Sequence, residues 1–278
     1  MNEIERFKEE VLKNYPRLTK EDKFTFACHP GVPCFNDCCA DVNIFLTPYD
    51  IIRLKNRLKM DSQEFLAEHT IAPFDKNSKY PAILLKMRED EKKTCPFVTE
   101  KGCSVYEDRP WACRMFPLGL ASPGDDGVHN DEPFYFLLQE KMCKGHNEKQ
   151  QWTIGQWLSD QGIDEYDKMG EKYKAITLHK FFQEGGKLSP DKMDMFHMVC
   201  NNLDKFRRFL FGTSFFEKFE VDEDMKKKME TDDLALLDFG YQWIRFAIFG
   251  EPTMKIRENA AEAAKKKMEE KNKALKKS

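Results

Sequence analysis

The chain has 278 residues, a hydrophobic fraction of 41% that includes 23 Phe, a formal net charge of -3 and a pI near 6.1. This length and hydrophobic content are enough for one large domain or two modest ones. The nearly balanced charge argues against nucleic-acid binding. No run approaches the roughly 18 apolar residues of a membrane span, and Met1 to Lys20 lacks the apolar core of a signal peptide. We therefore expect a cytoplasmic protein without a membrane span.

The first half of the sequence predicts short helices and irregular loops. Residues 3–14 have apolar side chains at helical spacing, and Thr47-Pro48-Tyr49-Asp50 has the residues of a helix start. The second helix is expected to bury Ile51, Ile52, Leu54 and Leu58. Asp61-Ser62-Gln63-Glu64 predicts another capped helix. Residues 82–87 and 134–138 are predicted to be short strands of a small sheet or hairpin.

The second half of the sequence predicts a helical bundle. Capped or Pro-containing starts and apolar periodicity predict helices from Thr153, over 165–183, from Ser189 through Leu210, and over 232–249. The predicted fold class is therefore mainly α with small irregular or β elements. The expected domains are a cysteine-cluster metal-binding domain over 1–150, a helical domain over 151–252, and a basic Ala/Lys/Glu tail over 253–278. The helical part is a candidate surface for a protein partner.

Eight of the nine cysteines lie before residue 150, in three clusters. Thiolates are soft ligands that select zinc, iron–sulfur clusters or copper(I), and a cytosolic protein keeps its thiols reduced. The sequence therefore predicts a thiolate metal centre. The predicted ligands are Cys28, Cys34, Cys38, Cys39, Cys95, Cys103, Cys113 and Cys143.

The number of cysteines leaves two arrangements open. Four ligands per zinc or per cubane cluster is the usual count, so eight cysteines suit two centres, or one centre with the others held for catalysis or structure. Cys38 and Cys39 are adjacent, and neighbouring side chains diverge, so the pair fits two neighbouring centres or one ligand and one spare thiol. Cys200 stands apart, between Val199 and Leu203 on a helical stripe, and is expected to be a core residue.

Buried structural thiols are the alternative interpretation of the eight cysteines. That interpretation fits poorly, because these cysteines lie among residues that interrupt regular structure and favour loops that wrap a metal. Those residues are Pro30, Gly31, Pro33 and Gly102.

Several motifs occur in the order found in one protein family. They are a cysteine cluster ending in Cys38-Cys39, Leu46-Thr47-Pro48-Tyr49-Asp50, Cys95 followed by Cys103 and Tyr106, and Arg109-Pro110-Trp111-Ala112-Cys113-Arg114-Met115-Phe116-Pro117. Over positions 24 to 146 the chain resembles the YkgJ-type cysteine-cluster family of zinc- or iron-chelating proteins, which includes the flagellin lysine-N-methylases. The spacings around Cys28 and Cys34 are wider than the common form.

The resemblance implies one or two iron–sulfur clusters of the 4Fe-4S type, with a redox or cluster-dependent modification role. In the methylase branch it implies S-adenosylmethionine-dependent methyl transfer to lysine, although the sequence has no glycine-rich loop typical of a nucleotide site. A zinc-stabilised interaction module is the alternative. Arg109 and Arg114 flank Cys113 and are predicted to offset the negative charge of a cluster. No catalytic residue is indicated.

Overall fold

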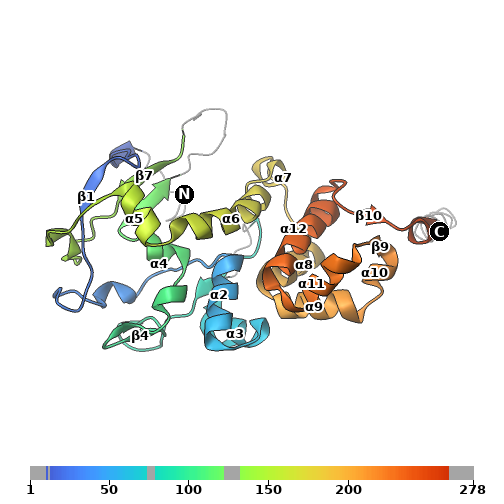
Figure 1. Ribbon diagram of the computed structural model, residues 1–278, viewed down its shortest axis with the longest axis horizontal. Helices are drawn as coiled ribbons and strands as arrows, with labels where there is room; N and C mark the ends of the chain where they lie inside the picture. Colours follow the sequence, from blue (N-terminus) through green and yellow to red (C-terminus); the bar gives the residue numbers. More distant parts are fainter. Residues whose placement is uncertain (1–10, 12, 74–78, 122–131, 263–278) are drawn as a thin grey trace. The chain divides into compact units, whose positions relative to one another are not determined.

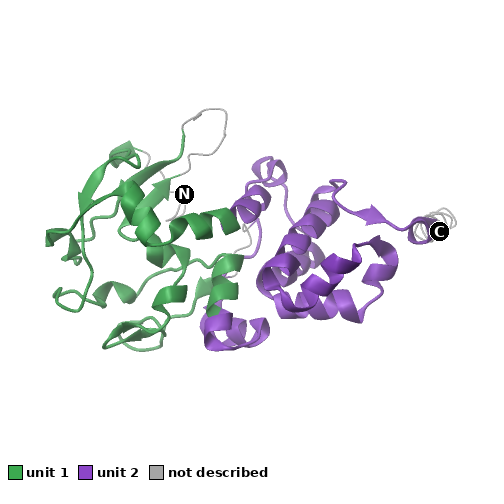
Figure 2. Ribbon diagram, viewed as in Figure 1, with its two compact units in different colours: residues 1–54, 84–169 green, residues 55–83, 170–278 purple. Residues whose placement is uncertain are grey.

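The computed structural model describes residues 11, 13–73, 79–121 and 132–262. The described residues form two compact units, shown in Figure 2. Unit 1 holds those up to Leu54 and from Leu84 to Met169, and unit 2 holds those from Lys55 to Ile83 and from Gly170 onward. The predicted domain boundaries at residues 150 and 252 stay a prediction.

The predicted fold class is confirmed in its main terms. About half of the described structure is helical, and its strands form small antiparallel pairs without a closed sheet. Most of the predicted helix over residues 3–14 and most of the tail lie outside the described residues. None of the described helices is long and apolar enough to cross a bilayer.

Unit 1 is built from short elements joined by loops (Figure 1). Its antiparallel pairs are β1 (Lys23–Thr25) with β8 (Gln151–Thr153), β4 (Val98–Thr99) with β5 (Gly102–Cys103), and β6 (Leu118–Ala121) with β7 (Phe134–Leu137). Its other elements are η1 (Asp37–Cys39), β3 (Leu84–Leu85), η2 (Tyr106–Asp108), α4 (Trp111–Met115), η3 (Gly145–Asn147) and α5 (Ile154–Asp160). Helices α2 (Pro48–Leu58) and α6 (Ile163–Thr177) begin in unit 1 and end in unit 2.

The core of unit 1 gathers residues from both ends of its sequence. Phe26 contacts the rings of Phe116 and Trp157 edge-on, with centroids 5.8 and 5.5 Å apart. The helix predicted from Thr153 is confirmed as α5, because Thr153 and Gln156 form the reciprocal capping box that orients Trp157 toward this core. This packing joins β1 to the segment that follows the last clustered cysteine.

Unit 2 is a group of packed helices (Figure 1). Many of its buried side chains are aromatic. Helix α12 packs on α8, α9 and α11, and Phe206 stacks on Trp243 with centroids 5.5 Å apart. Gly240 of α12 allows α12 to lie close to α8, since a Cβ at residue 240 would lie 2.5 Å from Val199 Cγ1. Its helices are α3 (Ser62–His69), α7 (Lys180–Gln183), α8 (Pro190–Asn201), α9 (Leu203–Gly212), α10 (Phe215–Lys218), α11 (Glu223–Thr231) and α12 (Asp233–Phe249). Its strands are β2 (Thr70–Ile71), β9 (Phe219–Glu220) and β10 (Lys255–Ile256).

Two predicted helices are wrong in their extent. The helix expected over 165–183 ends at Thr177, and α7 begins after His179, whose Nδ1 accepts a hydrogen bond from the Phe181 N–H at 3.1 Å. The helix expected from Ser189 through Leu210 is broken at Asn202, which has φ −117° and ψ 68° and caps α9. In both cases a side-chain cap competes with the helical backbone while the apolar spacing continues.

The predicted strands form, but with different lengths and partners. The segment predicted over 82–87 contributes only β3, which is bridged to Phe45 at Leu84. The strand predicted over 134–138 is β7, and it pairs with β6 rather than with the earlier segment. The apolar alternation therefore located the strands but not their pairing.

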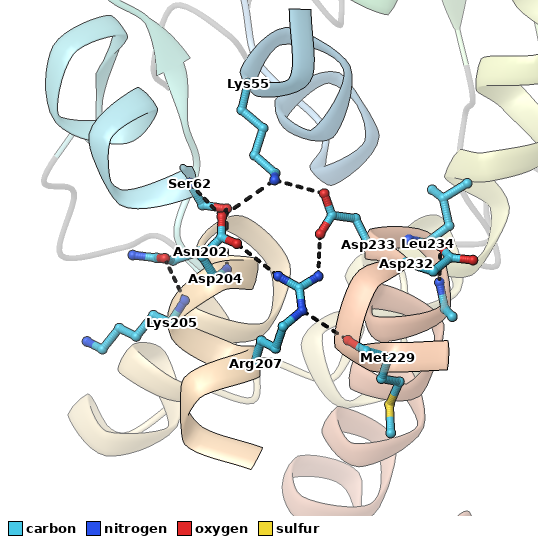
Figure 3. A network of polar contacts seen from close by, with 11 residues as sticks. Lys55, Ser62, Asn202, Asp204, Lys205, Arg207, Met229, Asp232, Asp233 and Leu234 are labelled. Carbon is cyan, nitrogen blue, oxygen red and sulfur yellow. Dashed lines mark hydrogen bonds and ion pairs between the residues drawn. The ribbon is translucent and has the colours of Figure 1, made fainter. Parts of the chain in front are cut away.

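A buried polar network holds unit 2 together (Figure 3). Lys55 is only 6% exposed, and its Nζ lies 2.8 Å from Asp233 Oδ2 and 3.5 Å from Asp204 Oδ2. Arg207 contacts the same two carboxylates at 2.5 and 2.8 Å. The backbone N–H and hydroxyl of Ser62 both donate to Asp204 at 2.7 Å. These contacts join the C-terminal part of α2 to α3, α9 and α12.

Asp204 makes the stability of unit 2 depend on pH. Burial acts to raise its pKa, but the Ser62 hydrogen bonds and the charges of Lys55 and Arg207 outweigh burial and lower it. A carboxyl with a lowered folded-state pKa stabilises the fold fully above its unfolded value, about pH 4, and this stability is lost as the pH falls through the folded pKa. We expect the urea midpoint of unit 2 to fall below about pH 4. Asp204→Asn should flatten part of this dependence, and an unchanged profile in the variant would contradict the assignment.

Candidate metal centre

Four of the predicted ligands surround one cavity of unit 1. Its walls include Cys28, Cys34, Cys38 and Cys143, together with apolar side chains. The apolar part of the wall is Phe26, Val32, Phe116 and Met142. We call these four cysteines group 1. They come from the loop after β1, from η1, and from the loop before η3.

Tight backbone packing brings the two ends of group 1 together. The Ala27 N–H donates to the Gly145 carbonyl at 3.1 Å, which places Cys28 beside the Cys143 loop. A Cβ on Gly145 would lie 2.6 Å from the Ala27 carbonyl oxygen, so only glycine fits here without a shift. The Lys144 N–H also donates to Cys34 Sγ at 3.0 Å.

The other four predicted ligands form group 2. Cys39, Cys95, Cys103 and Cys113 influence one another electrostatically, with Cys39 close to Cys95 and Cys113, and Cys113 close to Cys95 and Cys103. The Cys95 N–H donates to the Cys39 carbonyl at 2.8 Å, and Cys103 pairs with Val98 across the β4–β5 turn. Gly102 has φ +108° in that turn, a conformation that favours glycine.

Cys38 and Cys39 lie in the same short 3₁₀ helix but belong to different groups. A 3₁₀ helix has three residues per turn, so neighbouring side chains point about 120° apart. Cys38 faces the cavity of group 1, while Cys39 lies near Cys95 and Cys113. Asn36 supports η1 from the left-handed conformation, φ 71°, and its Nδ2 donates to the Thr99 carbonyl at 2.9 Å.

The thiols disfavour ionisation of one another. Burial, followed by repulsion from Cys38, Cys34 and Cys143, raises the pKa of Cys28 to about 11. Burial, followed by repulsion from Cys95, raises the pKa of Cys113 to about 12.

The pKa values of three further cysteines, Cys95, Cys103 and Cys143, are raised mainly by burial. Cys38 differs: the Cys39 thiol donates a hydrogen bond to it, which lowers the pKa of Cys38 to about 7 and raises that of Cys39. Crowded thiols of this kind are most readily stabilised as thiolates by a bound cation.

Backbone N–H groups point at several of the sulfurs. The N–H two residues ahead donates to the sulfur at three positions: Phe97 to Cys95, Val105 to Cys103, and Gly145 to Cys143. The same local turn is therefore used in both groups. Such donors stabilise a thiolate and orient it as a metal ligand.

Asp50 fixes the helix that contributes Cys113. Its carboxylate is fully buried and accepts from the Thr47 N–H at 2.7 Å, the Thr47 hydroxyl at 2.8 Å and the Trp111 N–H at 2.8 Å. The carboxylate thus caps both α2 and α4, and Cys113 lies two residues after Trp111 in α4. Burial raises the pKa of Asp50, and these hydrogen bonds oppose that effect. The sequence motif marked Asp50 only as a helix start, and its second role was missed.

The two predicted charge-balancing arginines occupy different surroundings. Arg109 is close to Cys103 and Cys113, stacks on Tyr106 at 3.7 Å, and donates to Tyr106 and Gln161. Arg114 donates to the carbonyls of Arg109, Gln161 and Glu107, so it holds the loops around α4. The predicted role of both residues toward a cluster stays a prediction.

The remaining thiol lies elsewhere. Cys200 is 1% exposed in α8 of unit 2, and burial raises its pKa well above the ordinary value. Of the histidines near the clustered cysteines, His29 Nδ1 accepts from the Gly31 N–H at 3.1 Å, and His146 Nε2 lies 3.0 Å from the Leu138 carbonyl.

The donor set fits a thiolate-bound metal in type, number and grouping. All eight donors are soft sulfur, they divide into fours, and backbone N–H groups already face several of them. Within the described ranges, however, no three His, Cys, Asp or Glu side chains converge to hold a single metal ion. Group 1 is therefore a gathering of thiols around a cavity, group 2 is a set of neighbouring thiols, and neither is a closed coordination shell.

Comparison with known families identifies the class of this segment. Residues 27–144 match the CxxCxxCC family model, described as "Putative zinc- or iron-chelating domain". This is the YkgJ-type family that the cysteine motifs resemble, so the predicted family resemblance is confirmed over these residues. Searches of curated proteins and of solved structures gave no significant match.

Proposed function

We propose that residues 27–144 form an iron–sulfur protein domain whose clustered cysteines hold a centre of the 4Fe-4S type. One observation carries the proposal: four thiols surround a cavity with an apolar wall instead of meeting at a point. A zinc site requires four sulfurs about 2.3 Å from one ion. A cube of iron and sulfide is larger than a single ion, so its four ligands stand further apart, as the thiols of group 1 do around their cavity.

The chain's own residues would tune such a centre. The N–H groups of Phe97, Val105, Lys144 and Gly145 donate to cysteine sulfur and would draw negative charge from it. Arg109 lies near group 2 and offsets thiolate charge there. Apolar side chains line the cavity beside the group 1 sulfurs, although Cys28 itself is exposed to solvent. A bound cluster supplies one-electron redox chemistry, so the proposed role is electron transfer or a cluster-dependent modification.

Anaerobic purification tests this function. The protein should be brown, contain iron and acid-labile sulfide, and lose visible absorption when dithionite is added. A colourless protein that holds stoichiometric zinc would overturn the iron–sulfur proposal and support a zinc-stabilised module. Methyl transfer stays a prediction from the family resemblance, and isothermal titration with S-adenosylmethionine tests it directly.

Metal removal should loosen the cysteine loops without unfolding unit 2. Thiolate ligation contributes directly to folding stability in small metal domains, and the loops over 28–39 and 95–113 have little regular structure of their own. After chelation under reducing conditions, peptides from these loops should exchange amide hydrogen much faster by mass spectrometry. Peptides from α8 and α12 serve as the internal control. Unchanged exchange in the cysteine loops would contradict a structural role for the metal.

Gly145→Ala should weaken group 1 specifically. The new Cβ would press on the Ala27 carbonyl oxygen and the Phe26 ring, at 2.6 and 2.7 Å. Overpacking of this kind costs about 2 kcal/mol, and it moves the Cys143 loop away from Cys28. We expect lower metal content and a lower urea midpoint for unit 1.

Gly170→Ala is the matched control for this substitution. Gly170 lies within α6, and a Cβ there meets nothing within 4 Å. Alanine should raise helix stability by about 0.5–1 kcal/mol and leave the metal content unchanged. Equal metal loss in the two variants would show that the Gly145 effect is not local.

A further inference from the structure

We infer that the eight thiols form two separate four-thiolate centres joined through the Cys38–Cys39 peptide bond. This inference rests on the proposed function and deepens it by dividing the ligands. Group 1, with Cys28, Cys34, Cys38 and Cys143, is the first centre. Group 2, with Cys39, Cys95, Cys103 and Cys113, is the second.

This division rests on which thiols lie near one another. The electrostatic neighbours of Cys28 are Cys38, Cys34 and Cys143, and all four line one cavity. The neighbours of Cys113 are Cys95 and Cys103, and no cysteine of group 2 lines that cavity. The contact that crosses between the groups is the hydrogen bond between Cys38 and Cys39. A single four-ligand centre leaves one of these two gatherings unexplained.

Each group also has its own backbone support. Group 1 is held by the Ala27–Gly145 hydrogen bond and by the Lys144 N–H on Cys34. Group 2 is held by the Cys39–Cys95 hydrogen bond, the bridge between Ala40 and Thr94, and the β4–β5 pair. None of these bonds joins a cysteine of one group to a cysteine of the other, and the Asn36–Thr99 hydrogen bond links the two loops. Loss of one centre should therefore leave the backbone of the other in place.

The adjacent cysteines explain how two centres share one short segment. Side chains about 120° apart on a 3₁₀ turn diverge, so Cys38 and Cys39 can serve two sites on either side of the turn while their thiols stay within hydrogen-bond reach. Their Cα atoms are about 3.8 Å apart, as in any trans peptide. The two centres are therefore near neighbours linked by covalent bonds. Two clusters in this arrangement, when both are reduced, should show magnetic interaction in electron paramagnetic resonance.

Paired alanine variants test the division. Cys34→Ala with Cys143→Ala should remove the first centre, and Cys95→Ala with Cys103→Ala should remove the second. We expect each double variant to retain about half of the wild-type metal, about a twofold loss because two equal centres share the total. Cys200→Ala is the control and should retain all of it. A folded double variant that loses all metal, or two double variants that lose none, would overturn the inference.

Thiol mapping of the wild-type protein keeps the test independent of variant folding. Native protein is treated with N-ethylmaleimide before and after metal removal, and each cysteine is assigned by mass spectrometry. Protection of all eight clustered cysteines by metal supports two centres, and protection of only four overturns the inference while leaving the proposed function intact. A wild-type protein without thiolate-bound metal would overturn the proposed function itself. Two zinc ions per chain would support the division of ligands and overturn the choice of iron.

Discussion

Asp50→Ala is expected to destabilise unit 1 and to reduce metal binding at group 2. The substitution removes an acceptor that is fully buried and leaves the N–H groups of Thr47 and Trp111 without their partner. Buried donors that lose their acceptor cost about 1–3 kcal/mol each, so we expect a loss of about 3 kcal/mol. Because Trp111 begins the helix that contributes Cys113, the position of that ligand should be lost as well.

The measurements for this variant are urea unfolding and metal per chain. Asp50→Asn keeps the size of the side chain and one acceptor oxygen, and it should show a smaller loss. Asp222→Ala removes an exposed cap of α11 in unit 2, which accepts from Asp224 and Met225. Loss of that cap should cost about 1 kcal/mol and leave metal unchanged. Full metal retention in a destabilised Asp50→Ala variant would show that Asp50 does not position Cys113.

Lys55→Met is expected to destabilise unit 2 by about 3 kcal/mol, because breaking a buried ion pair leaves an uncompensated charge. Asp204 and Asp233 both face the Lys55 ammonium, and only Arg207 would remain to balance them (Figure 3). Methionine has similar length and removes the charge without opening a large cavity. The transition should be followed by the fluorescence of Trp243, with the other tryptophans replaced by Phe.

An exposed ion pair in the same unit provides the control. Lys172 Nζ lies 2.7 Å from Asp238, but the two side chains are 61% and 48% exposed. Lys172→Met should change stability by no more than about 0.5 kcal/mol. Equal effects at the two lysines would mean that burial does not govern the Lys55 network. A double variant, Lys55→Met with Asp233→Asn, should recover part of the lost stability because it removes one unpaired carboxylate.

Local signals in the sequence predicted much of the fold. The starts of α2, α5 and α12 were found because side-chain caps and apolar spacing act within one or two turns. The breaks at His179 and Asn202 were missed, since an apolar stripe continues across a kink that a single side chain imposes. The β1–β8 pair was missed because its partners are separated by more than a hundred residues.

The candidate site was predicted as a set but not as an arrangement. Loop composition and soft-ligand chemistry selected the same eight cysteines that gather in unit 1. Their division could not follow from spacing, because Cys143 joins Cys28 through packing around Gly145, and Cys39 joins Cys95 through a backbone hydrogen bond. The adjacency of Cys38 and Cys39 predicted that their side chains diverge, but it did not predict which cysteines each would join.

The pairing of β1 with β8 brings the two ends of the cysteine segment together. Thr25 pairs with Gln151, so the chain enters and leaves the family-matched segment, residues 27–144, at nearly the same place. A segment whose ends meet can be inserted into a turn of another protein without forcing that protein apart. The β1–β8 pair forms such a junction for the cysteine segment, although residues 55–83 of that segment belong to unit 2.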